Sequence, residues 1–160
     1  MRSVPGLVVA GIAVALAGCS SGQVARYPVT EPYGSLPPGE TVAAPEYLGN
    51  GELWTVLWPD GRVVFEPGGP GEIRDDRGLA VKFPFWRGES VRGDLRITGR
   101  RLDGVAVPLT AEIPEGYGET GFQATGLVFA SEGCWEITAS AGEATLMFVT
   151  QAVIAPAPEG

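Results

Sequence analysis

The sequence has no histidine among its 160 residues, and this absence excludes several kinds of active site. Ser-His and Cys-His nucleophiles, blue-copper centres and most zinc sites all need an imidazole. Cysteine is almost as scarce, with only Cys19 and Cys134. At most one intramolecular disulfide can therefore form, and no metal or cofactor is expected.

Basic residues and long apolar runs are also scarce. The chain has 11 basic and 19 acidic residues, for a net charge of −8, so nucleic acid is not an expected partner. No run after residue 17 approaches the roughly 20 apolar residues that span a membrane. No stretch after that point shows a 3.6-residue period, so we expect little helix.

The few basic residues are unevenly placed. Arg101 is the last of them, and eight carboxylates follow it without a counter-charge. Residues 79–102 instead hold six basic and two acidic side chains. Two explanations are open: these regions are neighbouring strands that neutralise one another, or the basic residues form an anion-binding patch.

Residues 1–18 have the features of a signal peptide. Arg2 lies in a short n-region, and the apolar segment 7–17 is too short for an ordinary membrane span. We expect cleavage before Cys19, which removes one positive charge and leaves a net charge of −9.

The end of this segment, Leu16-Ala17-Gly18-Cys19, resembles the lipobox of bacterial lipoproteins. The resemblance implies that the Cys19 thiol is diacylated and becomes the first mature residue, because two acyl chains hold a domain stably on a bilayer. It also implies an extracytoplasmic position, at the outer membrane where two membranes exist, because Ser20 is not an aspartate. The alternatives are an uncleaved anchor helix and an ordinary secretory signal. With Cys19 lipidated, Cys134 is predicted to be a small buried side chain without a disulfide.

The mature chain divides into three parts. Residues 19–46 contain five prolines among Gly, Ser, Thr and Glu, which predicts a disordered tether. Residues 47–154 are a suitable length for one domain, and residues 155–160 are predicted to be a disordered tail.

The domain is predicted to be all-β, as an immunoglobulin-like antiparallel β-sandwich of about 7–8 strands. Short β-rich runs separated by Gly, Pro or Asp give strands at 53–58, 62–65, 80–85, 94–100, 108–113, 122–129, 134–140 and 144–153. Residues 66–78 are predicted to be a loop.

The last two strands are predicted to form a hairpin with Trp135 at the centre of the core. Apolar residues alternate with polar ones from Trp135, the pattern of a half-buried strand. A two-residue turn at Ala141-Gly142 would place Trp135 opposite Phe148 and Ile137 opposite Leu146.

Three segments carry a second resemblance: residues 82–88 (KFPFWRG), residues 99–103 (GRRLD), and residues 116–136 with their glycines and Cys134-Trp135. Together they resemble uncharacterised bacterial secreted or lipid-anchored proteins with an immunoglobulin-like domain. The resemblance implies a β-sandwich at the cell envelope, and it implies no activity or catalytic residue.

Five residues are candidates for a ligand surface: Trp86, Arg87, Arg100, Arg101 and Tyr117. Aromatic rings and guanidinium groups together can stack on sugars or hold an anionic envelope polymer. The alternative is that Trp86 closes the core and the arginines pair with carboxylates.

Acidic residues provide weaker candidates. Asp75-Asp76 could bind calcium, but the loop lacks the spacing of a calcium motif. Glu115, Glu119 and Glu132 could supply a glycosidase pair, but they lie in or beside turns, where glutamate is ordinarily solvated.

Three functions follow, and the first is preferred. The chain is a non-enzymatic, lipid-anchored module that binds an envelope protein or polysaccharide, a structural spacer without a ligand, or an accessory domain or weak carboxylate-dependent glycoside hydrolase.

Overall fold

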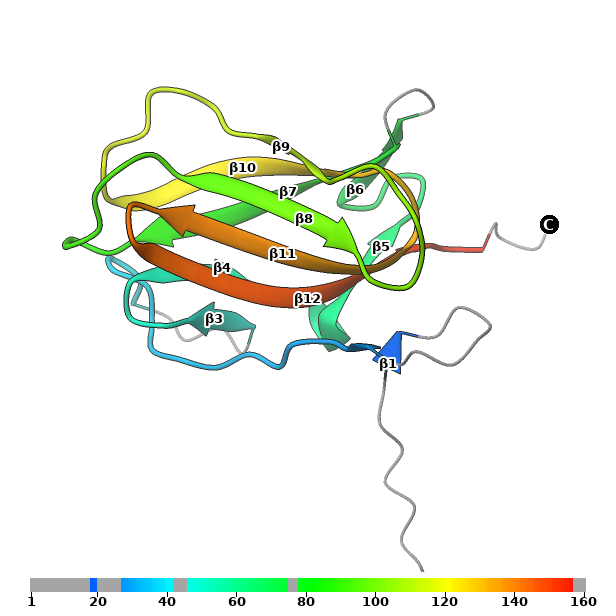
Figure 1. Cartoon of the computed structure of the whole chain (residues 1–160), viewed down its shortest axis with the longest axis horizontal. Helices are drawn as coiled ribbons and strands as arrows, with labels where there is room; N and C mark the ends of the chain where they lie inside the picture. Colours follow the sequence, from blue (N-terminus) through cyan, green and yellow to red (C-terminus); the bar gives the residue numbers. More distant parts are fainter. Residues whose placement is uncertain (1–17, 20–26, 42–45, 75–77, 157–160) are drawn as a thin grey trace, which may run out of the picture.

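The computed structural model describes residues 18–19, 27–41, 46–74 and 78–156, and its regular structure is almost entirely β (Figure 1). Each of the eight predicted segments contains a strand: β4 (Leu53–Val56), β5 (Arg62–Phe65), β7 (Gly78–Arg87), β8 (Arg96–Arg101), β9 (Thr110–Glu112), β10 (Gly121–Phe129), β11 (Gly133–Ala141) and β12 (Ala144–Ile154). Among the described residues, helix is limited to one 3₁₀ turn, η1 (Pro59–Gly61), and no helix in these residues has the length and apolar character to cross a membrane. The all-β prediction is confirmed.

Four further strands were not predicted: β1 (Gly18–Cys19), β2 (Tyr27–Pro28), β3 (Tyr47–Gly49) and β6 (Gly71–Arg74). The last of these lies inside the segment 66–78, so the prediction of a plain loop there is wrong. Its four residues pair antiparallel with the start of β7, from Gly71 opposite Val81 to Arg74 opposite Gly78. The β-propensity of this glycine-rich stretch is low, and the neighbouring strand supplies its hydrogen-bond partners.

The sheet is mixed, which corrects the prediction of a purely antiparallel arrangement. Its strand order is β3-β4-β7-β6-β5-β12-β11-β8, and β10 pairs with both β7 and β9. β5 runs parallel to β12 and to β6, whereas the other pairs are antiparallel. The sharp corner at η1, where Asp60 has a φ of +55°, sends the chain from β4, which pairs with β7, to β5, which pairs with β12. The strands on the two sides of this corner therefore do not pair with each other.

The sheet folds back on itself, so that two layers enclose the core. Figure 1 shows β8, β11 and β12 in front of β7 and β10. Rings from strands that are not neighbours in the sheet meet between the layers. Phe83 of β7 stacks on Phe148 of β12 with ring centroids 5.7 Å apart, and Phe129 of β10 meets Trp135 of β11 edge to face at 5.6 Å. The core therefore lies between the two layers.

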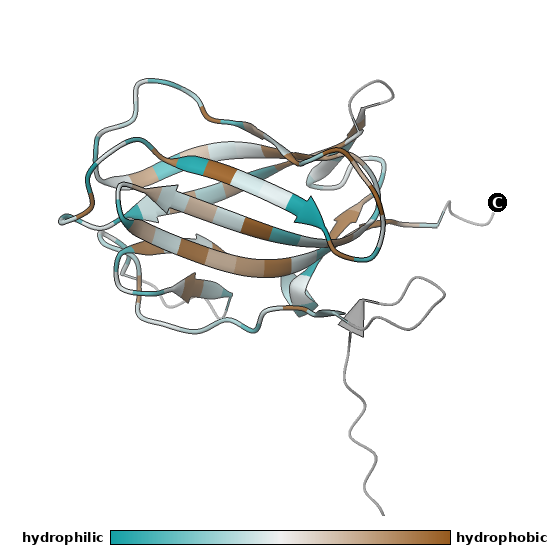
Figure 2. Cartoon of the chain, viewed as in Figure 1, coloured by the Kyte–Doolittle hydropathy of each residue, from teal (hydrophilic) through white to brown (hydrophobic). Residues whose placement is uncertain are grey.

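Trp135 has the central position that its sequence context predicts. It is 0% exposed, and its indole N–H donates a hydrogen bond to the Ser131 carbonyl at 3.1 Å. Figure 2 shows hydrophobic and hydrophilic residues alternating along β8 and β11, as expected of strands with one face on a core.

The register of the β11–β12 hairpin differs from the prediction by two residues. Trp135 pairs with Thr150, Ile137 with Phe148 and Ala141 with Ala144, so the turn is Gly142-Glu143. Gly142 has a φ of +57°, and glycine at the first position of a two-residue loop is typical of a type II′ turn. A shift of two leaves each side chain on its predicted face, because strand side chains alternate with a period of two. The faces are therefore correct and the facing partners are wrong.

Part of the predicted tether contacts the domain. Thr30 exchanges two hydrogen bonds with the backbone of Val149, at 3.0 and 2.8 Å, and the Trp54 indole donates to the Ser35 carbonyl at 3.1 Å. Glu40 hydrogen-bonds the Tyr47 hydroxyl, and burial together with the Glu40 charge raises the pKa of Tyr47. Residues 1–17 of the predicted signal peptide, 20–26 and 42–45 of the tether, and 157–160 of the tail lie outside the described residues.

Candidate functional site

Trp86 and Arg87, predicted to lie on a ligand surface, are buried at the end of β7. Each is only 5% exposed. The Trp86 ring packs edge to face between Tyr47, at 5.7 Å, and Phe122, at 5.3 Å. Arg87 continues the inward-facing series that contains Phe83 and Phe85. Neither side chain lies on an exposed surface, so the prediction that both do was wrong.

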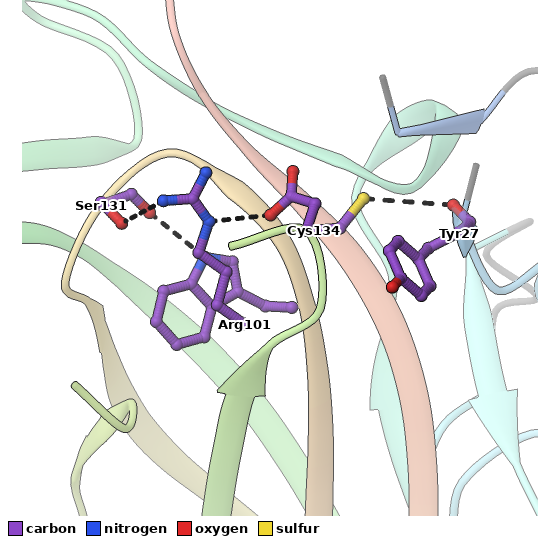
Figure 3. A network of polar contacts seen from close by, with 6 residues as sticks. Tyr27, Arg101, Ser131 and Cys134 are labelled. Carbon is purple, nitrogen blue, oxygen red and sulfur yellow. Dashed lines mark hydrogen bonds and ion pairs between the residues drawn. The ribbon is translucent and has the colours of Figure 1, made fainter. Parts of the chain in front are cut away.

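Arg100 and Arg101 pair with neighbouring carboxylates. The Arg100 side chain is 69% exposed, and its Nε lies 2.8 Å from Glu136 Oε1 on the adjacent strand. Arg101 Nε lies 2.8 Å from Asp103 Oδ1, and its Nη1 donates to Ser131 Oγ at 3.2 Å (Figure 3). The Arg100–Glu136 pair joins the two regions across neighbouring strands, as the neutralisation explanation predicts, whereas the Arg101–Asp103 pair is local, between residues two positions apart.

The five candidate residues do not form one surface. Arg87 lies where β7 ends, whereas Arg100 and Arg101 lie where β8 ends, and these strand ends point to opposite sides of the molecule in Figure 1. Arg87 contacts Gly93, just before β8 begins, so nearly the whole of β8 separates the two groups. At roughly 3.3 Å per residue, that separation is about 17 Å. Tyr117 stays at the Arg87 end.

A cleft of about 380 Å³ opens where β7 ends, beside Arg87. Its walls come from the end of β7, the start of β10, and the loop segments 93–95 and 113–119. Arg87 and Gln123 are its buried polar side chains, and we call this space the Arg87–Gln123 cleft.

Arg87 holds the loops at this cleft in place. Its Nη1 donates to the Gly93 carbonyl at 3.0 Å, and its Nη2 donates to the Gly118 carbonyl. No carboxylate among the described residues forms an ion pair with it. A buried guanidinium bonded only to carbonyl oxygens retains its positive charge at the cleft.

Two polar atoms in the cleft have no partner. Arg87 Nε and Gln123 Oε1 are the only buried side-chain nitrogen or oxygen atoms in the described part of the chain that make no hydrogen bond. Gln123 is 6% exposed. An unpartnered buried polar atom costs about 1–3 kcal/mol, so folded proteins rarely keep one without a use for it. Both unpartnered atoms belong to residues of one cleft.

The inner face of β10 explains why polar atoms end up here. Its buried positions read Phe129, Leu127, Thr125 and Gln123 toward the cleft, so the face changes from apolar to polar along the strand. Thr125 donates its hydroxyl to the Phe83 carbonyl at 2.7 Å, but Gln123 Oε1 has no such partner. Gln123 was not predicted to lie in the site. The sequence did contain a signal for it, because Gln123 and Thr125 continue the two-residue alternation of the core residues Leu127 and Phe129 and are polar.

An aromatic series supports the rim of the cleft. Tyr117 lines the cleft with 39% of its surface exposed, and its ring meets Phe122 at 6.2 Å. Phe122 rests in turn on Trp86, which rests on Tyr47. The buried Trp86 is therefore not a ligand contact, but it holds the exposed rings in place. Phe122 was also not predicted.

Carboxylates gather around the same opening. Asp94, Glu115 and Glu119 line the cleft, and all three are exposed. Glu132, the third glutamate considered for hydrolysis, accepts a hydrogen bond from the Ile154 backbone at 2.7 Å and does not line the cleft. The structure thus brings together two of the three predicted glutamates.

No group of three or more Cys, Asp or Glu side chains within the described ranges is arranged to hold a metal ion. Asp75 and Asp76, considered for calcium, lie outside these ranges.

Cys134 is buried, as predicted, but it forms a disulfide bond, so the prediction of an unpaired thiol is wrong. The sequence has one other cysteine, Cys19, whose side chain lies outside the described residues. In the backbone, Cys19 pairs with Tyr27, and the Tyr27 carbonyl lies 4.0 Å from Cys134 Sγ (Figure 3). The sequence-based argument excluded a disulfide by assigning Cys19 to a lipid.

No protein-family model matches the chain, and no curated protein or solved structure is significantly similar to it.

Proposed function

We propose that this protein is a non-enzymatic binding module of the bacterial cell envelope, built on an immunoglobulin-like domain and anchored by a lipid on Cys19. The observation that carries the binding proposal is the pair of unpartnered buried atoms, Arg87 Nε and Gln123 Oε1, in one cleft. Both atoms are shielded from solvent in the free protein, and a polar ligand group that reaches them would give each a hydrogen-bond partner. A spacer without a ligand has no need of them, so the cleft favours binding over the spacer alternative.

A weak glycoside hydrolase is the second candidate, because Glu115 and Glu119 share the cleft. A glycosidase needs one carboxylic acid that is kept protonated by a desolvated setting. Glu115, Glu119 and Asp94 are all exposed to solvent. This exposure favours a role in contacting a ligand over a role in cleaving one.

Export is supported by the N-terminal sequence and by the disulfide of Cys134, because disulfides persist in oxidising compartments. The proposed lipid anchor adds a chemical constraint. One sulfur cannot carry both a lipid thioether and a disulfide, and Cys19 is the only other cysteine in the chain. The proposed lipid on Cys19 and a disulfide between Cys19 and Cys134 are therefore mutually exclusive states of the chain.

Sedimentation with envelope material tests the binding proposal. The processed protein is purified from membranes in mild detergent and mixed with insoluble envelope polymer that has been freed of lipid. We expect the wild type to pellet with the polymer and Gln123→Met to remain in the supernatant. Arg100→Ala is the matched control, because Arg100 lies about 17 Å from the cleft, and we expect it to pellet like the wild type.

Two results would contradict the proposal. If no form pellets, the protein does not bind this polymer. If Gln123→Met pellets as well as the wild type, the Arg87–Gln123 cleft is not the binding site.

A further inference from the structure

The ligand of the Arg87–Gln123 cleft can be narrowed from the hydrogen-bond chemistry of its buried atoms. Arg87 Nε carries a hydrogen and needs an acceptor, whereas Gln123 Oε1 has lone pairs and needs a donor. A hydroxyl group is both donor and acceptor, so one hydroxyl or two adjacent hydroxyls satisfy both atoms. A carboxylate or phosphate serves only Arg87, and an ammonium group serves only Gln123.

The charge around the opening narrows the ligand further. One guanidinium, from Arg87, faces three carboxylates, from Asp94, Glu115 and Glu119, so the lining carries a net charge of −2. An anionic polymer is repelled by the exposed carboxylates. A cation that reaches the buried end of the cleft meets the Arg87 charge, which no carboxylate of the described residues neutralises. A neutral ligand avoids both costs, and its hydroxyls donate to the carboxylates.

The rim provides an apolar contact for such a ligand. The Tyr117 ring is exposed at the cleft and is supported by Phe122. A sugar ring has a face of C–H groups that packs on an aromatic side chain, while its hydroxyls point outward. The cleft is lined mainly by polar groups with Tyr117 as its aromatic contact, and its volume of about 380 Å³ lies in the usual range for a small-molecule site.

We infer that the Arg87–Gln123 cleft binds a neutral saccharide, with hydroxyl groups on Arg87 Nε and Gln123 Oε1 and a sugar ring on Tyr117. This inference rests on the proposed binding function and identifies the chemical class of its ligand. It also reverses the expectation of an anionic polymer held by arginines, because only one arginine reaches the site and carboxylates surround it.

Nuclear magnetic resonance titration of the ¹⁵N-labelled processed protein tests this inference directly. The probes are three neutral tetrasaccharides (cellotetraose, maltotetraose and chitotetraose), the anionic tetragalacturonate, and tetra-alanine amide. The signals followed are the Arg87 Nε–H and the Gln123 side-chain amide. We expect at least one neutral tetrasaccharide to shift both signals saturably and to slow hydrogen exchange at Arg87 Nε, and we expect tetragalacturonate to do neither.

Variants link the effect to the cleft. Gln123→Met is expected to weaken saccharide binding about tenfold or more, which corresponds to one lost hydrogen bond of about 1.4 kcal/mol. Tyr117→Ala is expected to weaken binding several-fold, and it alters an exposed ring, so folding is preserved. Arg100→Ala is expected to bind as the wild type does.

The outcomes separate this inference from the binding proposal. If tetragalacturonate or the peptide amide shifts these signals and the neutral sugars do not, the ligand class is wrong and the cleft remains a binding site. If no probe shifts them while Gln123→Met still abolishes sedimentation with envelope polymer, the saccharide inference alone fails. If Gln123→Met changes neither titration nor sedimentation, both fail.

Discussion

Replacement of Gln123 by Met is expected to stabilise the protein while it abolishes ligand binding. The two side chains have similar length and volume, so the exchange keeps the packing of the inner face of β10. It removes a buried carbonyl oxygen that has no hydrogen-bond partner. Most core substitutions destabilise a protein, so an increase in stability is a distinctive result.

The expected gain in stability for Gln123→Met follows from the missing hydrogen bond of the oxygen atom that the substitution removes. An unpartnered buried polar atom costs about 1–3 kcal/mol, and a volume-conserving exchange costs less than about 1.5 kcal/mol. The net gain is about 1 kcal/mol in the free energy of unfolding. For a domain of roughly 110 residues, this gain raises Tm by about 3–6 °C.

Thr125 provides the matched control. It lies two residues along the same strand on the same face, is equally buried, and donates its hydroxyl to the Phe83 carbonyl at 2.7 Å. Thr125→Val keeps the shape and removes a hydrogen bond that is made, so it is expected to destabilise by about 1 kcal/mol. Gln123→Met and Thr125→Val both replace a polar side chain by an apolar one, yet the first is expected to raise the free energy of unfolding and the second to lower it.

Urea unfolding of the purified protein without ligand measures both variants, followed by Trp fluorescence. The decisive quantity is the sign of the difference between Gln123→Met and the wild type. If Gln123→Met loses about as much stability as Thr125→Val, then Gln123 Oε1 is satisfied in the free protein. The argument that the cleft is built for a ligand would then be refuted.

Three other predictions concern the core, the cysteines and the hairpin turn. Trp135→Ala removes a fully buried side chain and should cost about 3–5 kcal/mol, enough to nearly abolish folding; cooperative melting near the wild-type temperature would contradict its central role. Alkylation of the denatured, unreduced protein should label Cys134 once if Cys19 carries a lipid and should label nothing if the disulfide is present, and palmitate labelling should disappear in Cys19→Ala. Gly142→Ala should destabilise by about 1–3 kcal/mol in thermal unfolding, because φ is +57° and an added Cβ would clash with the Arg92 carbonyl oxygen. Gly68→Ala, which also has a positive φ but open space around it, should destabilise less, and equal losses would count against the clash.

Local alternation and turn residues in the sequence were enough to predict eight of the strands, and alternation was enough to predict which face of the β11–β12 hairpin enters the core. Trp135, Ile137 and Ala139 are all buried, and the two-residue period fixes their common face whatever the pairing register. Phe83 and Phe85, two positions apart on one strand, are likewise both buried. Such inferences succeed because they depend only on the geometry of one strand.

Long-range pairing could not be read from the sequence, because it depends on segments far apart in the chain. β6 is a strand only because β7 supplies its hydrogen-bond partners, and the parallel pairing of β5 with β12 joins residues about 90 positions apart. The hairpin register pairs Ala141 with Ala144, so the turn falls at Gly142-Glu143, where Gly142 adopts a φ of +57°.

The candidate site was decided by the tertiary structure more than by residue type. Arg87 and Arg100 are the same kind of residue on neighbouring β-rich segments, yet Arg87 is buried at a cleft and Arg100 is exposed in a surface ion pair. Both residues were predicted from the sequence to contact a ligand. The sequence shows that a guanidinium group is present, but it does not show whether that group is buried or paired with a carboxylate. Arg87 and Gln123 are 36 residues apart in the sequence, and they line one cleft because β7 pairs with β10 in the fold. The fold also leaves Arg87 Nε and Gln123 Oε1 without hydrogen-bond partners there.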